Sequence, residues 1–381
     1  MDHRPGSEAE VAEIVRDAAG SGAGLAVRGG GTRVPDDDAG SILSTGGLTG
    51  ISLYEPGALT LVVRAGTPLD EVEAALDAEG QMLPFEPWDA RPLTGRNGAP
   101  TIGGVVATNA SGPRRIQAGA CRDSMIGVRF VDGTGAVVKN GGRVMKNVTG
   151  LDLVKLMAGS RGTLGVVTEV GFKVLPRPET TATVVLDGLN AAAAVRAMTA
   201  ATGTPFEVTG AAHLPSGAGG GPETLLRLEG FAGSVEYRSR ELARALGGFG
   251  AARVVEGAEL WQRVRDGGGF AGRDGAIWRI SVKPTDGPRL AGAIAPADVM
   301  FDWSGGLVWA LASEDFDLRA AMAGIAGHAT LVRAGPEAVT RWGVLHPEPA
   351  AVAALSDGLR RRFDPHGVFG AAATTRAPEP A

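Results

Sequence analysis

The sequence predicts an α+β fold made of two domains, and three observations lead to this prediction. The chain has 381 residues, more than a single hydrophobic core usually organises. In the first half, short apolar runs end in glycine-rich turns, a pattern typical of strands joined by tight loops. Residues 181–257 then follow the order strand, helix, strand, strand, helix, strand, which indicates a ferredoxin-like antiparallel sheet. The expected domains are residues 1–178 and 179–360, followed by a C-terminal return segment and flexible tail at residues 361–381.

The composition excludes several classes of protein. With 44% hydrophobic and 21% charged residues, a water-soluble globular protein is expected. The net charge of -5 offers no attraction for nucleic acid or an anionic membrane, and no apolar run approaches the roughly 20 residues that span a bilayer. The N-terminus has no apolar signal region, so a cytoplasmic location is expected, with any contact to the inner membrane made through partners. The single cysteine, Cys121, rules out an internal disulfide and an iron–sulfur cluster held by this chain alone, since such a cluster needs about four cysteines.

Two helices of the first domain are marked by their ends. Ser7 and Glu10 have the spacing of a capping box, so a helix is expected to begin at Ser7 and to end near Gly22. A second helix is expected after Thr67, with Thr67 as its cap and Pro68 as its first residue.

Strands of the first domain are expected where β-rich apolar runs meet glycine turns. One enters the glycine triplet from residue 24, another covers residues 59–66, and residues 127–142 read as a hairpin. A glycine turn feeding a long strand is expected at residues 162–176. Residues 95–112 are dense in glycine and show no helical period, which predicts an irregular loop.

The second domain continues with further strands and helices, and the sequence shows no internal repeat. Residues 217–222 read as a mobile loop, and the last helix is expected to stop before Pro365. Strands are expected at 181–188, 205–214, 224–231, 252–257, 277–284, 299–303, 306–312 and 328–334, and helices at 190–202, 235–247, 318–325 and 355–363.

Three consecutive glycines, Gly29 to Gly31, follow the first strand. They form neither a P-loop, because no Gly-Lys-Ser/Thr follows, nor a dinucleotide turn that opens a helix, because Pro35 and an acidic run come next. A nest of main-chain N–H groups around a phosphate fits the triplet, and a plain turn fits it equally well.

Two more glycine-rich stretches lie beside strands, "TIGGVVATNASG" at residues 101–112 and "AGSRGTLGVVTEV" at residues 158–170. The first has few bulky side chains, which favours a cleft for a flat ring over a surface loop. Either stretch taken alone is compatible with a simple turn. Three such turns together favour a large extended ligand with a pyrophosphate and two ring systems, such as a dinucleotide.

The motifs "VRGGGTR", "TIGGVVATNASG" and "KNVTGLDLVKLMAGSRGTLGVVTEV", in this order, resemble the FAD-binding domain of the vanillyl-alcohol oxidase/p-cresol methylhydroxylase (PCMH) superfamily. In the second half, "LWQRVRDG", "IWRISVKPT", "FDWSGGLVWAL", "GHATLVRA" and "FDPHGVF" are similar to the smaller FAD-binding subunits of bacterial glycolate oxidases. The resemblance implies a two-subdomain PCMH-type FAD-binding domain followed by a ferredoxin-like antiparallel-sheet cap domain. The family's C-terminal asparagine is replaced by Gly370, whose role is left open.

The resemblance also implies which residues hold FAD. The pyrophosphate loop would comprise Gly29, Gly30, Gly31, Thr32 and Arg33. The flavin and its ribityl chain would lie along Thr101, Gly103, Gly104, Thr108, Ser111 and Gly112. Main-chain groups of Gly165, Val166 and Val167 would hold the adenine. Covalent relatives commonly carry a histidine near the glycine loop, where this chain has Thr32 and Arg33, so FAD is expected to bind non-covalently.

Catalytic residues remain unassigned at this stage. The chain lacks the "His-x-Gly-Asp-Gly-Asn"-type metal segment of related dehydrogenases, and no metal site is expected. Arg279 is a candidate for holding a substrate carboxylate, and His328 a candidate for the base. A buried ion pair for Arg279 and a hydrogen-bonded core position for His328 are the favoured alternatives.

The resemblance favours an FAD-binding subunit of a 2-hydroxy-acid (glycolate-type) oxidase or dehydrogenase complex, an FAD-dependent oxidoreductase acting on CH–OH groups. Its implied partners are a larger FAD-containing catalytic subunit and an iron–sulfur subunit. The alternatives are a self-sufficient FAD oxidoreductase acting on another alcohol or hydroxy acid, and a structural subunit with a vestigial flavin site. Residues 307–312, with Trp303, Trp309 and Trp342, are the predicted docking face, and a core position is the favoured alternative for any one of these tryptophans.

Overall fold

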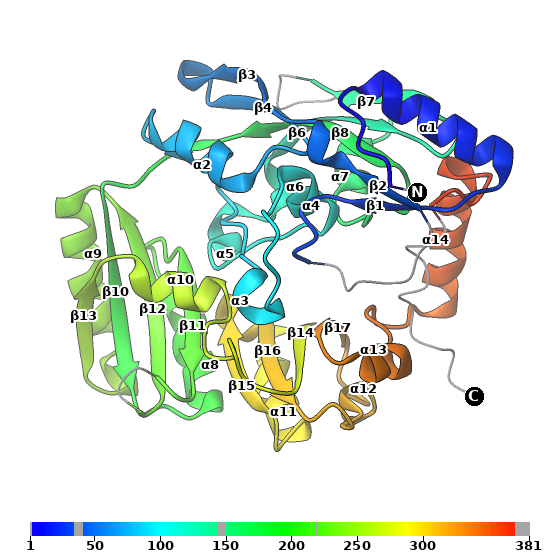
Figure 1. Cartoon of the computed structure of the whole chain (residues 1–381). Helices are drawn as coiled ribbons and strands as arrows, with labels where there is room; N and C mark the ends of the chain where they lie inside the picture. The colour runs from blue at the N-terminus through cyan, green and yellow to red at the C-terminus, as the bar shows by residue number, and fades with distance from the viewer. Residues whose placement is uncertain (1, 34–40, 143–149, 218–219, 370–381) are drawn as a thin grey trace.

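The computed structural model describes residues 2–33, 41–142, 150–217 and 220–369. Two bodies lie one above the other in Figure 1, with the first half of the chain in the upper one. Outside the described residues lie Pro35 with the acidic run, the "KNVT" that begins the longest of the quoted motifs, part of the 217–222 loop, and the tail with Gly370. None of the helices in the described segments is long and apolar enough to cross a membrane.

The upper body is built on a five-stranded antiparallel sheet in the order β3-β4-β8-β6-β7, beside a parallel pair β1-β2 and a short pair β5-β9. Its strands are β1 Leu25–Arg28, β2 Ser41–Ser44, β3 Ile51–Glu55, β4 Thr60–Arg64, β5 Gln81–Met82, β6 Met125–Val131, β7 Val137–Gly141, β8 Val166–Lys173 and β9 Leu175–Pro176. Its helices are α1 Glu8–Ser21, α2 Leu69–Asp77, α3 Arg91–Thr94, α4 Ile102–Ala107, α5 Arg115–Ala118, α6 Cys121–Ser124 and α7 Leu153–Met157.

The capping-box helix is confirmed, because the Ser7 hydroxyl accepts a hydrogen bond from the Glu10 N–H and Gly22 closes α1 in a left-handed conformation. The predicted cap of α2 is wrong. Helix α2 begins after Pro68, and the Thr67 hydroxyl instead donates to the Arg64 carbonyl at 2.7 Å. This hydroxyl therefore fixes the turn between β4 and α2 rather than the helix end.

The loop predicted at residues 95–112 is also wrong, because it contains helix α4. The Thr101 hydroxyl accepts from the Gly104 N–H, and Ile102, Val105 and Val106 are completely buried. Burial of these apolar side chains overrides the poor helix propensity of two glycines.

The lower body is one eight-stranded antiparallel sheet in the order β13-β10-β12-β11-β15-β16-β14-β17. Its strands are β10 Thr180–Asp187, β11 Gly210–Leu214, β12 Glu223–Gly230, β13 Ala252–Glu256, β14 Ala276–Val282, β15 Asp298–Asp302, β16 Leu307–Ala312 and β17 Gly327–Arg333. Its helices are α8 Ala191–Thr202, α9 Ala232–Ala245, α10 Glu259–Arg265, α11 Gly287–Ala293 and α12 Leu318–Ala321.

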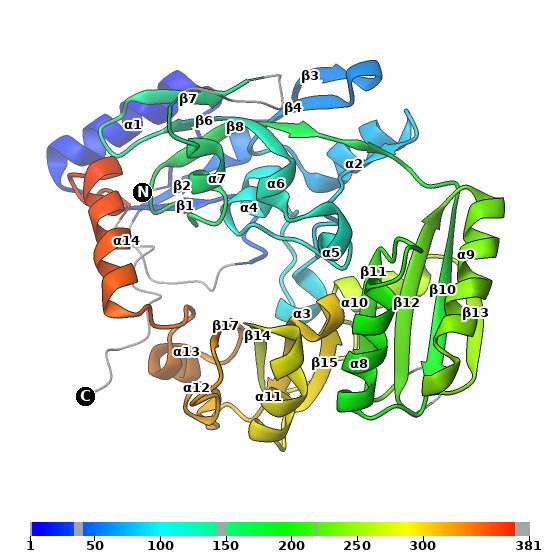
Figure 2. The same cartoon turned by 180° about the vertical axis from the view of Figure 1, so that it is seen from behind.

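The expected ferredoxin-like unit occurs twice. The order β10-α8-β11-β12-α9-β13 is followed by β14-α11-β15-β16-α12-β17, and the equivalent strands β11 and β15 join the two units. In Figure 2 helices α8 and α11 cover one face of the sheet, whereas the other face meets the upper body. The prediction of a sequence without repeats missed this duplication of structure, in which the second unit has much shorter helices.

The two domains share a hydrophobic core. Trp303 and Trp309 of the second domain cluster with Phe85 and Trp88 of the first. Every residue of β16 is buried, and Trp309 is 1% exposed. The prediction that residues 307–312 and their tryptophans form a docking face is therefore wrong for this strand, because its side chains fill the interior.

The end of the described chain returns to the first domain. Helix α13 Pro336–Trp342 is followed by α14 Ala350–Phe363, which runs beside the first domain in Figure 1. The Phe363 carbonyl accepts from the Gly133 N–H, and the Val368 carbonyl accepts from the Leu25 N–H at 2.7 Å. Val368 and Phe369 are buried with residues of α1 and β1. Strand β1 is thus held by the last residues that the structure describes.

Candidate functional site

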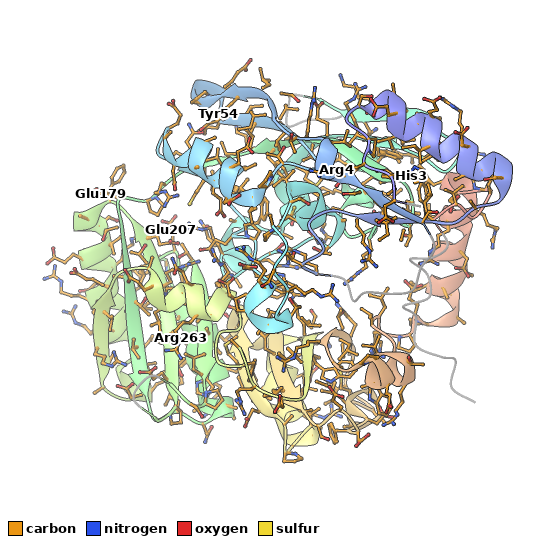
Figure 3. The ribbon with its side chains drawn as sticks, viewed as in Figure 1. His3, Arg4, Tyr54, Glu179, Glu207 and Arg263 are labelled. Carbon is orange, nitrogen blue, oxygen red and sulfur yellow. The ribbon has the colours of Figure 1, made fainter. Side chains whose placement is uncertain are left out.

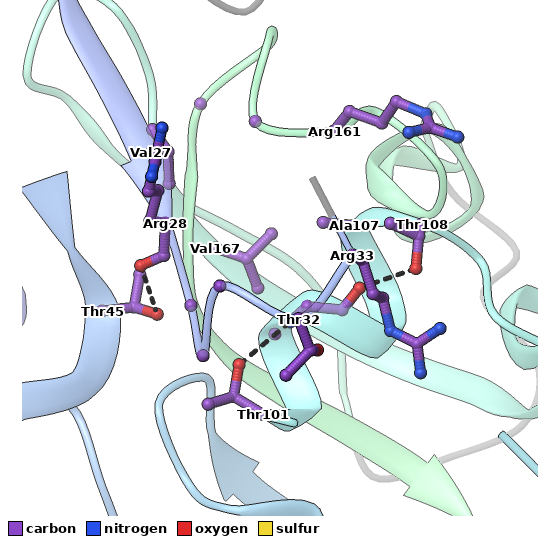
Figure 4. Close-up of a pocket in the computed structure, with 17 residues that line it drawn as sticks. Val27, Arg28, Thr32, Arg33, Thr45, Thr101, Ala107, Thr108, Arg161 and Val167 are labelled. Atoms are coloured by element: carbon purple, nitrogen blue, oxygen red, sulfur yellow. Dashed lines mark hydrogen bonds between the residues drawn. The ribbon is translucent and has the colours of Figure 1, made fainter. Parts of the chain in front are cut away.

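A pocket with about 790 Å³ of empty space opens in the first domain, and it collects all but three of the residues expected to hold FAD. The loop after β1, helix α4 and the turn before β8 form its walls, as Figure 4 shows. The predicted residues that line it are Gly29, Gly30, Gly31, Thr32, Arg33, Thr101, Gly103, Gly104, Thr108, Gly165 and Val167.

Two separate physical requirements explain why glycine stands at each position of the triplet. A Cβ on Gly29 would lie 2.4 Å from the Thr101 hydroxyl, and one on Gly30 would lie 1.6 Å from the Ala99 carbonyl oxygen. Gly31 has a φ of +69° and open space around it, a conformation that side chains other than glycine rarely adopt. The triplet therefore presses its backbone against residues 99–101 and then turns along the pocket wall.

The main-chain amides of this turn have no acceptor within the described protein. None of the N–H groups of residues 29–32 donates a hydrogen bond to a described residue, although Thr32 is buried. Polar groups in such positions are nearly always paired. Adjacent N–H groups in one turn suit an anionic oxygen, and a phosphate is such a ligand.

Three predicted FAD contacts lie outside this pocket. The Ser111 hydroxyl accepts a hydrogen bond from the Cys121 N–H at 3.0 Å. Gly112 accepts one from the Trp303 indole, also at 3.0 Å, which ties the two domains together. Val166 is completely buried in the core around α1. All three occupy packed positions outside the lining of this pocket.

Other residues of the pocket wall were missed by sequence reasoning. One of them is Arg161, a charged residue in the turn before β8, where its φ is +53°. Burial lowers its pKa, and no described residue forms an ion pair with it. An arginine between a serine and a glycine in "GSRG" was the available signal. The others are Val27, Arg28, Thr45, Ala107 and Gly162.

Arg33 connects the pocket to the second domain. Its guanidinium donates to the Trp88 carbonyl and lies 4.5 Å from the centre of the Trp88 ring. That ring meets Trp309 edge to face, with 5.3 Å between the ring centres. Burial lowers the Arg33 pKa to about 10, and its Nη1 is buried without a hydrogen-bond partner. A charged donor is thereby left free at the pocket.

The two catalytic candidates lie on the sheet face that meets the first domain. Arg279 on β14 pairs with Thr330, and His328 on β17 pairs with Ser281, so Arg279 and His328 share that face. The buried ion pair expected as the alternative for Arg279 is absent among the described residues, and its guanidinium instead lies 4.8 Å from the Trp303 ring centre.

The surroundings of His328 differ from the core position considered for it. His328 is exposed, and its pKa is lowered by partial burial and by the positive charges of Arg279 and Arg115. Across the described ranges, no three His, Cys, Asp or Glu side chains come together as a metal-binding group. Cationic groups thus dominate this end of the site.

Comparisons with known proteins agree with this architecture. Residues 3–141 match a family described as FAD binding domain. The chain is similar to the glycolate oxidase subunit GlcE of Escherichia coli (strain K12), with 36% identity over 84% of this chain and 83% of that protein. It is also 36% identical to the glycolate oxidase subunit GlcD of Bacillus subtilis (strain 168) over 32% of this chain and 24% of that protein.

A solved structure of alkyldihydroxyacetonephosphate synthase has the same fold, with a TM-score of 0.68, 16% identity, and coverage of 98% of this chain and 76% of that one. The predicted α+β, PCMH-type fold is confirmed. The chain carries an FAD-binding domain and belongs to the family of the glycolate oxidase subunit GlcE.

Proposed function

We propose that the chain is the FAD-binding subunit of a complex that oxidises a 2-hydroxy acid such as glycolate. The observation that carries the proposal is the row of main-chain amides at residues 29–32, which line the pocket and donate no hydrogen bond to a described residue. The similarity of this chain to a glycolate oxidase subunit supports the substrate class and the assembly into a complex.

The pocket residues fit FAD. The amides of residues 29–32 would hold the pyrophosphate, and the backbone at Gly104 leaves room for a flat ring, whereas Gly103 packs closely against Ala65. Gly165 and Val167 would lie against the adenine. Bound FAD would accept the hydride of the substrate carbinol carbon. The protein's part is to bind and orient FAD, and its buried Arg33 supplies positive charge beside it.

Spectra and turnover test this function. The purified protein should show the absorbance bands of a flavin. Glycolate oxidation with an artificial acceptor should appear when the chain is co-expressed with its partner subunits. A protein that never takes up flavin would indicate a structural subunit, and full turnover by the isolated chain would indicate a self-sufficient oxidoreductase.

We expect the flavin to be released by acid, because the described residues that line the pocket include no histidine, cysteine or tyrosine for a covalent link. Thr32 and Arg33 follow the glycine turn, and Cys121 is buried with its pKa raised by desolvation, so its reactive thiolate is suppressed. Precipitation with acid should leave yellow flavin in the supernatant. Flavin that stays in the washed pellet contradicts this prediction.

For the partner, we propose the larger FAD-containing subunit, and we place its contact on α14. None of the side chains of α14 is buried, and three apolar ones share a face: Val352, Leu355 and Leu359 are 46%, 71% and 40% exposed. Arg361 and Arg362 follow this apolar stripe, and neither forms an ion pair with a described residue. A partner with an apolar groove and an acidic border fits this helix.

Leu355→Asp is expected to abolish co-purification of the larger subunit, because it places a carboxylate in the centre of the stripe. Val254→Asp is the matched control, since Val254 is an exposed apolar residue of the distant edge strand β13. Both variants should keep their flavin. Equal recovery of the partner with the two variants would remove α14 from the interface.

A further inference from the structure

Two arginines from different domains lie on one tryptophan ring. The guanidinium carbon of Arg115, in α5 of the first domain, is 4.4 Å from the centre of the Trp303 ring. That of Arg279, in β14 of the second domain, is 4.8 Å from the same centre. The Trp303 indole donates to the Gly112 carbonyl of the first domain. The three side chains therefore form one cluster across the boundary between the domains.

No carboxylate among the described residues forms an ion pair with Arg115 or Arg279, although Asp123 and Asp302 each raise the pKa of one of them from further away. Neither guanidinium donates a hydrogen bond to a described residue, and Arg279 Nε is buried without a partner. The Trp309 indole N–H beside Arg279 is buried without an acceptor as well. Unpaired buried donors and neighbouring like charges are both unfavourable, so an anion that accepts from them would stabilise the cluster.

Asp302 does not play that part. It is fully buried, its Oδ1 accepts from the Trp303 N–H, and burial raises its pKa to about 7. Near neutral pH it is therefore only partly ionised. The hydrogen bond that it accepts from the Trp303 N–H fixes the backbone of Trp303, and among the described residues no guanidinium donates to it.

The backbone at this point is strained in a way typical of functional sites. Trp303 and Ser304 have φ values of +52° and +58°, which residues other than glycine seldom adopt. Two such residues in succession keep the indole pointing out of the sheet toward the first domain, where its N–H finds Gly112.

The cluster lies close to the FAD pocket. The positive charges of Arg33 and Arg161, which line that pocket, reach Arg279 and contribute to lowering its pKa. The positive charges of Arg279 and Arg115 contribute in the same way to lowering the pKa of His328. An anion at the cluster would thus lie beside the pocket, on the sheet face that carries Arg279 and His328.

We infer that Arg115 and Arg279 form a carboxylate-binding site at which this chain itself holds a small 2-hydroxy acid or its 2-oxo acid product. The inference rests on the proposed function for the identity of the acid. A planar guanidinium donates two parallel hydrogen bonds to one carboxylate, and a second arginine serves the neighbouring oxygen of a 2-substituted acid. Substrate binding would then belong to this chain even though it lacks the metal segment of related dehydrogenases.

The site is tested by titrating the full chain with oxalate and with glycolate in a calorimeter, once with flavin bound and once without. Saturable oxalate binding is expected, weakened about 10- to 100-fold in Arg279→Gln and Arg115→Gln because each loses charged hydrogen bonds. Arg279→Lys keeps the charge without the planar fork and should bind with intermediate affinity. Arg341→Gln is the control, because Arg341 also lies over a tryptophan, Trp342, but pairs with Asp315 at the surface.

Flavin absorbance separates this inference from the proposed function. Protein with full flavin but no oxalate binding would overturn the carboxylate site and leave the FAD function intact. Oxalate binding by flavin-free protein that never takes up FAD would support the site and overturn the proposed function. Equal oxalate affinity in the wild type and in the Gln variants at both arginines would overturn the site, while circular dichroism shows that the variants are folded.

Discussion

Replacing Gly104 with tryptophan is expected to yield a folded protein that binds no FAD. A Cβ on Gly104 would meet only the Thr101 hydroxyl, at 3.4 Å, so the backbone of α4 tolerates a side chain there. Beyond the Cβ the indole enters the pocket that Gly104 lines, and it fills the space proposed for the flavin. Loss of the flavin absorbance, with an unchanged circular dichroism spectrum, is the measurement.

Gly233→Trp is the matched control, because Gly233 lies in the first turn of surface helix α9 with nothing within 4 Å of its added Cβ. It should bind FAD as the wild type does. Gly30→Asp is a poorer test, since its Cβ would overlap the Ala99 carbonyl and loss of flavin would then also report misfolding. A Gly104→Trp protein with a full complement of FAD would mean that the flavin binds elsewhere.

Arg227→Met is expected to lower the free energy of unfolding by about 3–5 kcal/mol, the usual result when one partner of a buried ion pair is removed. Arg227 is 2% exposed and donates to both carboxylate oxygens of Glu86, at 2.8 and 2.7 Å. Arg227 and Glu86 lie in the cleft between the domains, whose lining also includes Glu179, labelled in Figure 3. Glu229, which also pairs with Arg227, would keep its partner Arg114.

The pH dependence identifies the cause of this loss. Burial opposes ionisation of Glu86, but Arg227 outweighs it and holds the Glu86 pKa below its ordinary value. A lowered pKa contributes stability above the unfolded-state pKa, and that stability disappears as the pH falls through the folded-state value. Without Arg227, the Glu86 carboxyl can relieve its cost by taking up a proton. The difference between the variant and the wild type should therefore shrink in acid.

Denaturant unfolding measures this effect. Arg244→Met is the control, because Arg244 pairs with Glu241 on an exposed helix surface, where such pairs contribute less than about 1 kcal/mol. Glu86→Gln in the Arg227→Met background should recover much of the stability by removing the uncompensated charge. Equal unfolding midpoints for Arg227→Met and the wild type would show that the ion pair does not contribute to stability.

The pocket proposed for FAD gathers most of the residues predicted from the sequence, because its signals are local. Three glycine-rich stretches each stand beside a β-rich run, and a turn that brings backbone close to a neighbour needs glycine wherever it lies in the fold. The same reasoning placed Ser111 and Gly112 in the site, whereas the structure shows them packed outside the lining of the pocket. Glycine spacing alone does not distinguish a backbone pressed against a ligand from one pressed against Glu86 or Trp303.

The features that the sequence did not predict depend on contacts between distant parts of the chain. Helix α4 is stabilised by apolar side chains that pack into the core, which its glycines concealed. The second ferredoxin-like unit has helices α11 and α12 of seven and four residues, too short to give a helical period. Arg115 and Trp303 belong to different domains, and no pattern in either segment indicates that they meet.

The hydrogen bond between Leu25 and Val368 has a consequence for biosynthesis. Strand β1 leads directly into the FAD loop, yet it is secured by residues that leave the ribosome long after it. The nascent chain must therefore expose the apolar surface of α1 and β1 until residues 364–369 arrive. Flavin loading would then follow translation, and a prematurely terminated chain would present that uncovered surface to chaperones and proteases rather than join an assembly.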